Sequence, residues 1–249
     1  MSSAVKNEQP KDKKVNTIDI KIPLQKDDET CGIACLLGYY QYLGLNWDYE
    51  ELNKEVEMLD TGGTLGVNLG IHALQLGMEV TLSSYNLQVF DPSWAKLSPQ
   101  ELTFKLQKQM DAKKADQKLV QASSAYIRYL NLGGKIEFCD SSIDELKKKL
   151  DEEIPILVGL SSTFLYQSKR EIPDTTELDD INGYPAGHFV VINGYDEKNK
   201  MISVCDPYPE TPFSEQGSTY CVSADHLMTS IFLGIITYDA NFLTIQKRK

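Results

Sequence analysis

The chain has 249 residues, of which 41% are hydrophobic and 24% are charged, and its formal net charge is −11 at pH 7. This length and composition are ordinary for a globular protein with one large core or two small ones. The acidic excess argues against a nucleic-acid partner, because phosphate binding needs clustered Lys and Arg, and it weakly favours basic or neutral substrates by electrostatic steering.

The N-terminal residues are polar and rich in lysine, without the apolar stretch of a secretory signal. We expect residues 1–16 to form a disordered arm. No stretch approaches about 18 consecutive apolar residues, so we expect no membrane span. The five cysteines show no regular spacing, which suits a reducing compartment. These features predict a cytoplasmic protein, although export by a route that needs no signal peptide stays open. They do not indicate an oligomeric state.

Residues 17–24 alternate apolar and polar side chains and predict a strand that leads into a polar, acidic loop. An apolar helical pattern follows over residues 30–43, and Cys31 lies on its first turn. Unpaired backbone N–H groups and the helix dipole favour a thiolate at that position. Gln25, six residues upstream, carries a side-chain amide that can donate hydrogen bonds to an oxyanion. The stretch therefore predicts a cysteine nucleophile with a glutamine-assisted oxyanion hole.

Helical patterns continue after the nucleophile. A glycine-rich turn at residues 60–66 separates two of them, and a capping box at Ser98 opens a longer helical region. We expect residues 91–132 to form a helical insertion. The other predicted elements in this part of the chain are helices at residues 46–58 and 68–76 and a strand at residues 79–85.

The last third of the chain has the pattern of a sheet. A helix over residues 142–153 begins with a capping box, and residues 168–184 form a polar, acidic loop. The predicted strands lie at residues 136–139, 154–160, 188–195, 201–205, 218–222 and 232–238. Helices followed by an antiparallel sheet predict an α+β fold, with a helical lobe over about residues 17–135 and a β-rich lobe over about residues 136–249.

The three histidines offer few choices for a catalytic base. His72 lies inside a helical pattern, which indicates a surface or packing role, and His226 has no recognisable partner pattern. His188 follows a glycine and opens an apolar strand, so it is fixed in place beside a cleft. A base must meet its nucleophile in space rather than in sequence, and His188 is the histidine that we expect there.

A carboxylate that orients His188 is predicted from the hairpin that follows it. If the turn is centred near Glu197, position 206 lies opposite position 188, with Cβ atoms about 5 Å apart. Asp206 occupies this position, and Pro207 ends its strand. The Asp206 carboxylate could accept the imidazole N–H, fix the tautomer and stabilise the imidazolium.

These residues resemble those of the papain-like cysteine peptidases, most closely the bacteriocin-processing, double-glycine leader peptidases and their stand-alone relatives. The similarity spans about residues 21–85 and 153–207. It is carried by Gln25 six residues before Cys31, Gly32 directly after it, Gly187 and His188 at a strand start, and Asp206, Pro207 and Tyr208 at a strand end. The resemblance implies a papain-like two-lobe fold in one catalytic domain over residues 17–249. It also implies a peptide or protein substrate and no cofactor.

The resemblance further implies a role for individual residues. Cys31, His188 and Asp206 would form a catalytic triad, and Gln25 would complete the oxyanion hole. The substrate contacts implied in the same way are Gly63, Thr64 and Gly187. The expected activity is therefore that of a cysteine peptidase that cleaves a peptide or amide bond.

Several other interpretations remain open at this level. The same triad could serve an acyl transferase or a deamidase, or the chain could be a peptide-binding module derived from a peptidase. Cys31 could also be a small buried apolar residue, which is the role that we assign to Cys35. A metal site built from Cys31, Cys35, His188 and Asp206 lacks the paired ligand spacing of zinc sites, so we expect no metal.

Overall fold

The computed structural model describes residues 15–59, 62–138, 143–173, 175, 177–213, 215 and 217–248. Within these ranges a group of helices precedes a mostly antiparallel sheet, so the fold is α+β, as predicted. None of the described helices is long and apolar enough to cross a membrane.

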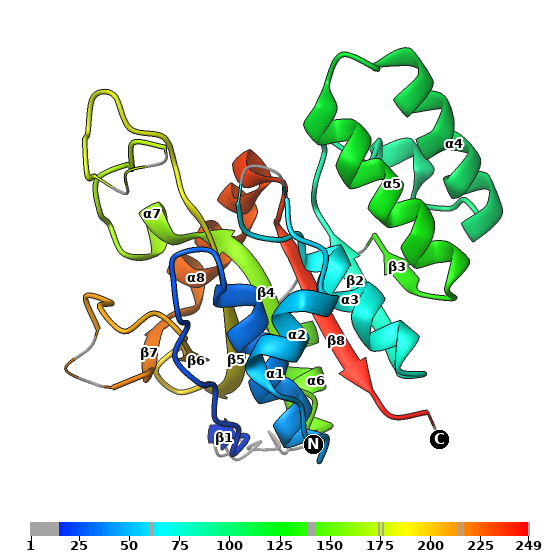
Figure 1. The fold of residues 1–249 in the computed structure, drawn as a ribbon. Coiled ribbons are helices and arrows are strands. Elements are labelled where there is room, and N and C mark those ends of the chain that lie inside the picture. The colour runs from blue at the N-terminus through cyan, green and yellow to red at the C-terminus, as the bar shows by residue number, and fades with distance from the viewer. Residues whose placement is uncertain are drawn as a thin grey trace, which may run out of the picture.

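The N-terminal half is mostly helical (Figure 1). Its elements are β1 (Val15–Thr17), α1 (Cys31–Tyr42), α2 (Tyr49–Glu55), α3 (Gly66–Gln75), β2 (Glu79–Ser84), the 3₁₀ turn η1 (Pro92–Trp94), α4 (Pro99–Ala112) and α5 (Gln117–Asn131). The capping box at Ser98 is present and starts α4. The long helical region predicted after it is two helices, because the Asp116 side chain accepts the Leu119 N–H and begins α5. Helices α4 and α5 pack on each other, and α5 packs on α3.

The C-terminal half supplies most of the sheet. Its elements are β3 (Lys135–Glu137), α6 (Ile143–Asp151), β4 (Ile156–Ser161), α7 (Ser162–Leu165), β5 (Gly187–Asp196), β6 (Met201–Cys205), β7 (Thr219–Ser223), α8 (Ala224–Leu233), the 3₁₀ turn η3 (Gly234–Thr237) and β8 (Asn241–Gln246). The described strands run in the order β3-β2-β8-β4-β5-β6-β7. Strand β1 pairs with the C-terminal end of β5. Among the described strands, only β2 and β3 pair in parallel. Strand β2 of the helical half thus belongs to the same sheet as the strands of the C-terminal half.

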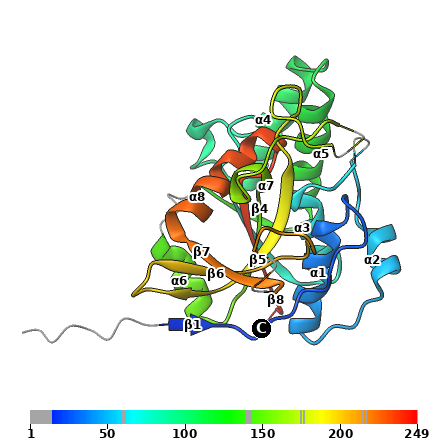
Figure 2. The same ribbon diagram turned by 90° about the vertical axis from the view of Figure 1, so that its left-hand side faces the viewer.

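Helices cover both faces of this sheet. Helix α1 packs on β5, and α3 packs on β2 and β8, whereas α6 and α8 pack on β4. Figure 2 shows α1 and α3 on one side of the central strands and α6 and α8 on the other. The central strands are therefore buried, and β4 and most of β5 are apolar as a result.

Helix α1 is the element on which the site depends. Its residues 31–40 are all buried. One side packs on β5, and the other faces the segment after β1, whose isoleucines at alternate positions are buried. Gly38 permits this contact, because a Cβ there would lie 2.6 Å from Lys21 O and 2.9 Å from Ile22 Cα. The helix is thus held between the sheet and residues 18–24, which lead into the loop before it.

Two strand predictions were wrong in position. Residues 17–24 bury every second side chain as far as Ile22, as the pattern indicates, but the strand pairing with β5 covers only Val15–Thr17. The apolar run at residues 232–238 is the end of α8 and the turn η3, and strand β8 comes after it. A short apolar run does not distinguish a buried helix from a strand. The overlooked signal is Ser223, whose side chain accepts a backbone N–H and caps α8.

Parts of the sequence predictions lie outside the described residues. They are residues 1–14 of the predicted arm, residues 60–61 of the glycine-rich turn, and the capping box at residue 142. The last two residues of the predicted arm, Val15 and Asn16, belong to β1.

We expect Gly38→Ala to lower the free energy of unfolding by about 1–3 kcal/mol, because the added methyl group would overlap backbone atoms of the neighbouring segment. Gln41→Ala, at an exposed position of the same helix, should change it by less than about 0.5 kcal/mol. Urea unfolding followed by circular dichroism measures both variants. Equal stability of Gly38→Ala and the wild-type protein would contradict the close contact between α1 and residues 18–24.

Candidate active site

Cys31 is the first residue of α1 and is 8% exposed. The Thr30 side chain before it does not cap the helix. Thr30 Oγ1 instead accepts hydrogen bonds from the N–H groups of Lys26 and Asp27, both at 3.3 Å. Within the described part of the chain, the first helical turn is therefore left without a side-chain cap. Such a helix end stabilises negatively charged groups placed next to it.

Helix α1 and strand β5 are in close contact next to Cys31. A Cβ at Gly32 would lie 3.2 Å from the ring of Phe189 and 3.0 Å from the methyl group of Thr64, so a larger residue would push the helix away. One turn further along, the fully buried Cys35 donates from Sγ to Phe189 O at 3.3 Å. Burial raises the pKa of the Cys35 thiol well above its ordinary value. Cys35 thus fixes α1 on β5 as an uncharged thiol.

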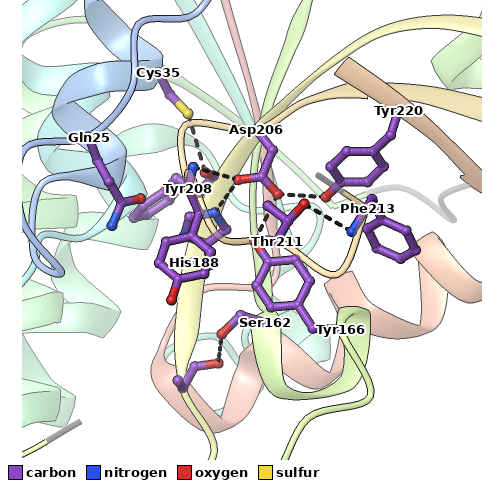
Figure 3. Close-up of polar contacts among 12 residues, drawn as sticks. Gln25, Cys35, Ser162, Tyr166, His188, Asp206, Tyr208, Thr211, Phe213 and Tyr220 are labelled. Atoms are coloured by element: carbon purple, nitrogen blue, oxygen red, sulfur yellow. Dashed lines mark hydrogen bonds and ion pairs between the residues drawn. The ribbon is translucent and has the colours of Figure 1, made fainter. Parts of the chain in front are cut away.

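The contact between α1 and β5 brings His188 against Cys31. His188 pairs with Leu160 of β4 and is 6% exposed. Its Nε2 donates to Asp206 Oδ1 at 2.8 Å (Figure 3). The Cys31 side chain lies close enough to act on the pKa of the imidazole. Burial acts to lower the pKa of His188, but the charges of Asp206 and Cys31 outweigh it and raise that pKa to about 10. The imidazolium is therefore favoured at neutral pH.

Asp206 is completely buried and accepts several hydrogen bonds besides that of His188 (Figure 3). The hydroxyl groups of Tyr166 and Tyr220 donate to Oδ2 at 2.8 and 2.5 Å, and the Tyr208 N–H donates to Oδ1 at 2.9 Å. Burial acts to raise the pKa of the carboxyl. The charge of His188 and the hydrogen bonds hold it below its usual range instead. Asp206 is thus an ionised group that fixes the imidazole ring.

Sequence reasoning missed the two tyrosine hydroxyl donors. Tyr220 lies on β7 opposite Val204, so its side chain emerges on the same face of the sheet as that of Asp206. Correct pairing of β6 with β7 could have identified it. Tyr166 follows the short helix α7, and no local pattern connects it with Asp206.

The predicted register of the hairpin was wrong, although the predicted contact between His188 and Asp206 is present. The turn is centred between residues 198 and 199, and a bulge lies between Ile192 and Gly194. The pairing ends at Val191 opposite Cys205, so one further step would place Asp206 level with position 190. Positions 188 and 190 lie on the same face of the strand, and the imidazole reaches the carboxylate diagonally.

Gln25 is held beside this group by its backbone and its side chain. Its N–H donates to Pro207 O at 2.9 Å, which ties the loop before α1 to the residue after Asp206. Its Nε2 donates to Asp27 O at 2.9 Å and retains a second hydrogen. Its Oε1 is buried and has no hydrogen-bond partner among the described residues. The amide thus has one donor hydrogen free for a substrate oxygen.

A cavity of about 450 Å³ lies against His188. The described residues that line it are Gln25, Asp28, Ser162, Tyr166, Ser168, Glu171, Leu178, Ala186, Gly187, His188, Tyr208, Glu210 and Pro212.

The three residues for which substrate contact was expected lie in two places. Gly187 is in the cavity wall together with Gln25 and His188. Gly63 and Thr64 are not among its described lining residues. Thr64 is buried, donates from Oγ1 to Glu57 O at 2.7 Å, and reaches α1 only through its methyl group.

The other two histidines lie elsewhere and have other partners. His72 is 2% exposed, and its Nδ1 lies 2.8 Å from the hydroxyl of Tyr40, so its predicted packing role is confirmed. His226 bonds through Nε2 to Leu165 O at 2.9 Å and stacks on Phe164. Among the described residues, no three His, Cys, Asp or Glu side chains are grouped as metal ligands.

Comparisons with known proteins bear on the family and the fold. A sequence model of the Peptidase C39-like family matches residues 17–221. A search of curated proteins finds no match. Among solved structures, a Bacillus anthracis protein assigned as a C39-like peptidase shares 15% sequence identity, with a TM-score of 0.50 over 95% of this chain and 99% of that one. This likeness supports the fold described above.

Two further solved structures are more distant. A double-glycine motif protease from an AMS/PCAT transporter, in complex with the leader peptide, shares 11% identity, with a TM-score of 0.44 over 94% of this chain and 95% of that one. Xylellain, a cysteine protease from Xylella fastidiosa, shares 14% identity, with a TM-score of 0.42 over 94% of this chain and 86% of that one.

We expect Tyr220→Phe to lower the free energy of unfolding by about 1.5–3 kcal/mol, because the buried Asp206 carboxylate loses a hydrogen bond. The matched control is Tyr195→Phe, whose hydroxyl donates to the exposed carboxylate of Asp151 at 2.9 Å. The control should lose less than about 1 kcal/mol. Differential scanning calorimetry compares the two. Equal losses would show that Asp206 does not depend on its buried donors.

Proposed function

The chain belongs to the Peptidase C39-like family, as its motifs predict, and we propose that it is a cysteine peptidase that cleaves a peptide or amide bond in a peptide or protein. The observation that carries this proposal is the buried series Cys31, His188 and Asp206, in which His188 bonds to the carboxylate and lies within electrostatic reach of the Cys31 side chain. A cysteine nucleophile needs a base within hydrogen-bond distance and a third group that orients the base. These three side chains meet both needs.

In the first step, the Cys31 thiolate adds to the carbonyl carbon of the scissile bond. The resulting oxyanion accepts hydrogen bonds from the Cys31 backbone N–H and from Gln25 Nε2. His188 then gives its Nδ1 proton to the leaving nitrogen, the C–N bond breaks, and the amine product departs. A thioester remains on Cys31, and Asp206 keeps the neutral imidazole in position.

In the second step, water resolves the thioester. His188 takes a proton from the water molecule as its oxygen attacks the thioester carbonyl carbon. Collapse of the second oxyanion breaks the C–S bond and releases the acid product. Cys31 returns as a thiolate and His188 as an imidazolium, so the site is ready for the next substrate.

Two observations favour peptide-bond cleavage over a deamidase and over a binding module. A deamidase releases only ammonia, whereas the cavity of about 450 Å³ against His188 has room for an amine leaving group the size of several residues. Packing of residues 168–184 over Cys31 would argue for a binding module or for autoinhibition. The segment between α7 and β5 instead extends away from the sheet (Figure 1), and its described residues line one wall of the open cavity: Tyr166, Ser168, Glu171, Leu178 and Ala186.

We expect Cys31→Ala to abolish peptide cleavage and the fast labelling of the protein by iodoacetamide at about pH 6, where an ordinary thiol with a pKa of about 8.5 reacts slowly. Cys221, an exposed free cysteine, provides the internal reference. Cys221→Ala should retain both cleavage and fast labelling. Mass spectrometry of tryptic peptides measures labelling at each cysteine. Labelling of Cys31 no faster than that of Cys221 would contradict the thiolate.

The raised pKa of His188 also sets the pH range of activity. The imidazolium that protonates the leaving nitrogen is present below this pKa and is lost as pH rises through it. Asp206→Asn removes the carboxylate that raises the pKa, so we expect the alkaline limb of kcat/KM to move down by at least about one pH unit. Asp19→Asn, at an exposed position, is the control and should leave the profile unchanged. An unmoved alkaline limb in Asp206→Asn would show that His188 does not set it.

A further inference from the structure

The cavity against His188 has an acidic wall that the cleavage step does not use. Its carboxylates are Asp28 from the loop before α1, Glu171 from the segment between α7 and β5, and Glu210 from the loop after β6. No Lys or Arg is among the described lining residues. In the part of the chain that the structure describes, none of the three carboxylates forms an ion pair. The wall therefore carries three carboxylates against one imidazolium, that of His188, and its net charge is negative.

The three carboxylates line one cavity and lie close enough to influence the same neighbouring groups. Burial, together with the charge of Asp28, raises the pKa of Glu171 against the opposing charge of His188. Burial and the charges of Glu210, Asp28 and Glu171 together raise the pKa of Tyr208. The Tyr208 phenol thus lies in the field of all three acidic side chains. Like charges around a shared cavity repel one another, and a bound cation would relieve that repulsion.

The remaining polar and aromatic groups of the wall also suit a cation. The Tyr208 ring stacks on Tyr166 with centroids 6.0 Å apart, and aromatic faces attract ammonium and guanidinium groups. Gln25 adds its Oε1, a fully buried acceptor without a hydrogen-bond partner among the described residues. An unpartnered buried acceptor is costly until a donor reaches it. Lys and Arg side chains carry only donors, so they match this wall.

The position of the cavity indicates which part of a substrate reaches it. His188, which protonates the leaving nitrogen, is in the cavity wall. Cys31, which retains the acyl part, is not among the described lining residues. Residues that follow the scissile bond therefore lie against His188 and enter the cavity.

We propose that this cavity selects substrates with a lysine or arginine side chain among the first residues after the scissile bond. The inference rests on the proposed peptidase function and names the substrate class of the same site. Asp28, Glu171 and Glu210 are its specificity-determining residues, and the Tyr208 ring is the surface on which the cation lies.

A digest of a proteome-derived peptide library tests this preference, with Cys31→Ala as the blank. We expect Lys and Arg to be enriched, and Asp and Glu depleted, at one of the first three positions after the cut. One cleaved sequence is then synthesised with either Arg or Gln at that position. We expect kcat/KM for the Arg peptide to exceed that for the Gln peptide by about 10-fold, which is the effect of two partly exposed ion pairs. This ratio should decrease as the salt concentration rises, because salt screens the ion pairs.

Matched variants connect the preference to the wall. Glu171→Gln and Asp28→Asn should each lower the Arg-to-Gln ratio by about 3-fold. Glu177→Gln removes the same charge from an exposed position on the Glu171 segment outside the described wall and should leave the ratio unchanged. A wild-type ratio near one, or equal ratios in all three variants, would overturn the inference while the peptidase activity stands. Failure of the wild-type protein to cleave any library peptide would overturn the proposed function and the inference together.

Discussion

A buried carboxylate stays ionised only when donors replace its lost hydration, and Asp206 depends on this condition. Its donors within the described chain come from four separate segments: β5, the end of α7, the loop after β6, and β7. The charge that they maintain raises the pKa of His188 and fixes its ring. In the proposed mechanism, the reactivity of Cys31 therefore depends on the assembled C-terminal sheet and not only on its own helix.

Close packing places α1 and the loop before it against β5 and the end of β6. Gly32 lets α1 approach Phe189, the residue after His188, and the Cys35 thiol bonds to the backbone carbonyl of that same residue. The backbone of Gln25 bonds to Pro207, directly after Asp206. The regions around Cys31, His188 and Gln25 are thus linked by short contacts to β5 or to the segment that follows β6. A displacement of α1 would therefore disturb all three groups at once.

The parts of the site that could be predicted from the sequence are those with local signals. Cys31 at a helix start and Gln25 before it are read from neighbouring residues, and His188 stands out among three histidines. The pairing of Asp206 with His188 was predicted through a register that was off by two residues. A register error of two residues leaves every side chain on the same face of the strand. An error of one residue would have placed Asp206 on the opposite face from His188.

What could not be predicted depends on long-range assembly. Tyr166 and Tyr220 reach Asp206 from elements that only the complete sheet brings together. The acidic cavity wall likewise combines Asp28, Glu171 and Glu210 from three loops far apart in the chain. The apolar run at residues 232–238 has no period that separates helix from strand, so tertiary packing decided its structure.

The central claim is that His188 is charged at neutral pH because it lies between Cys31 and Asp206. Nitrogen NMR of protein labelled at its three histidines tests it most directly, with His188→Gln to assign the signal. We predict that both ring nitrogens of His188 carry protons at neutral pH, and that one proton is lost only as pH approaches its raised pKa of about 10. A neutral His188 ring at neutral pH, with a proton on one nitrogen only, would contradict the ion pair and the mechanism built on it.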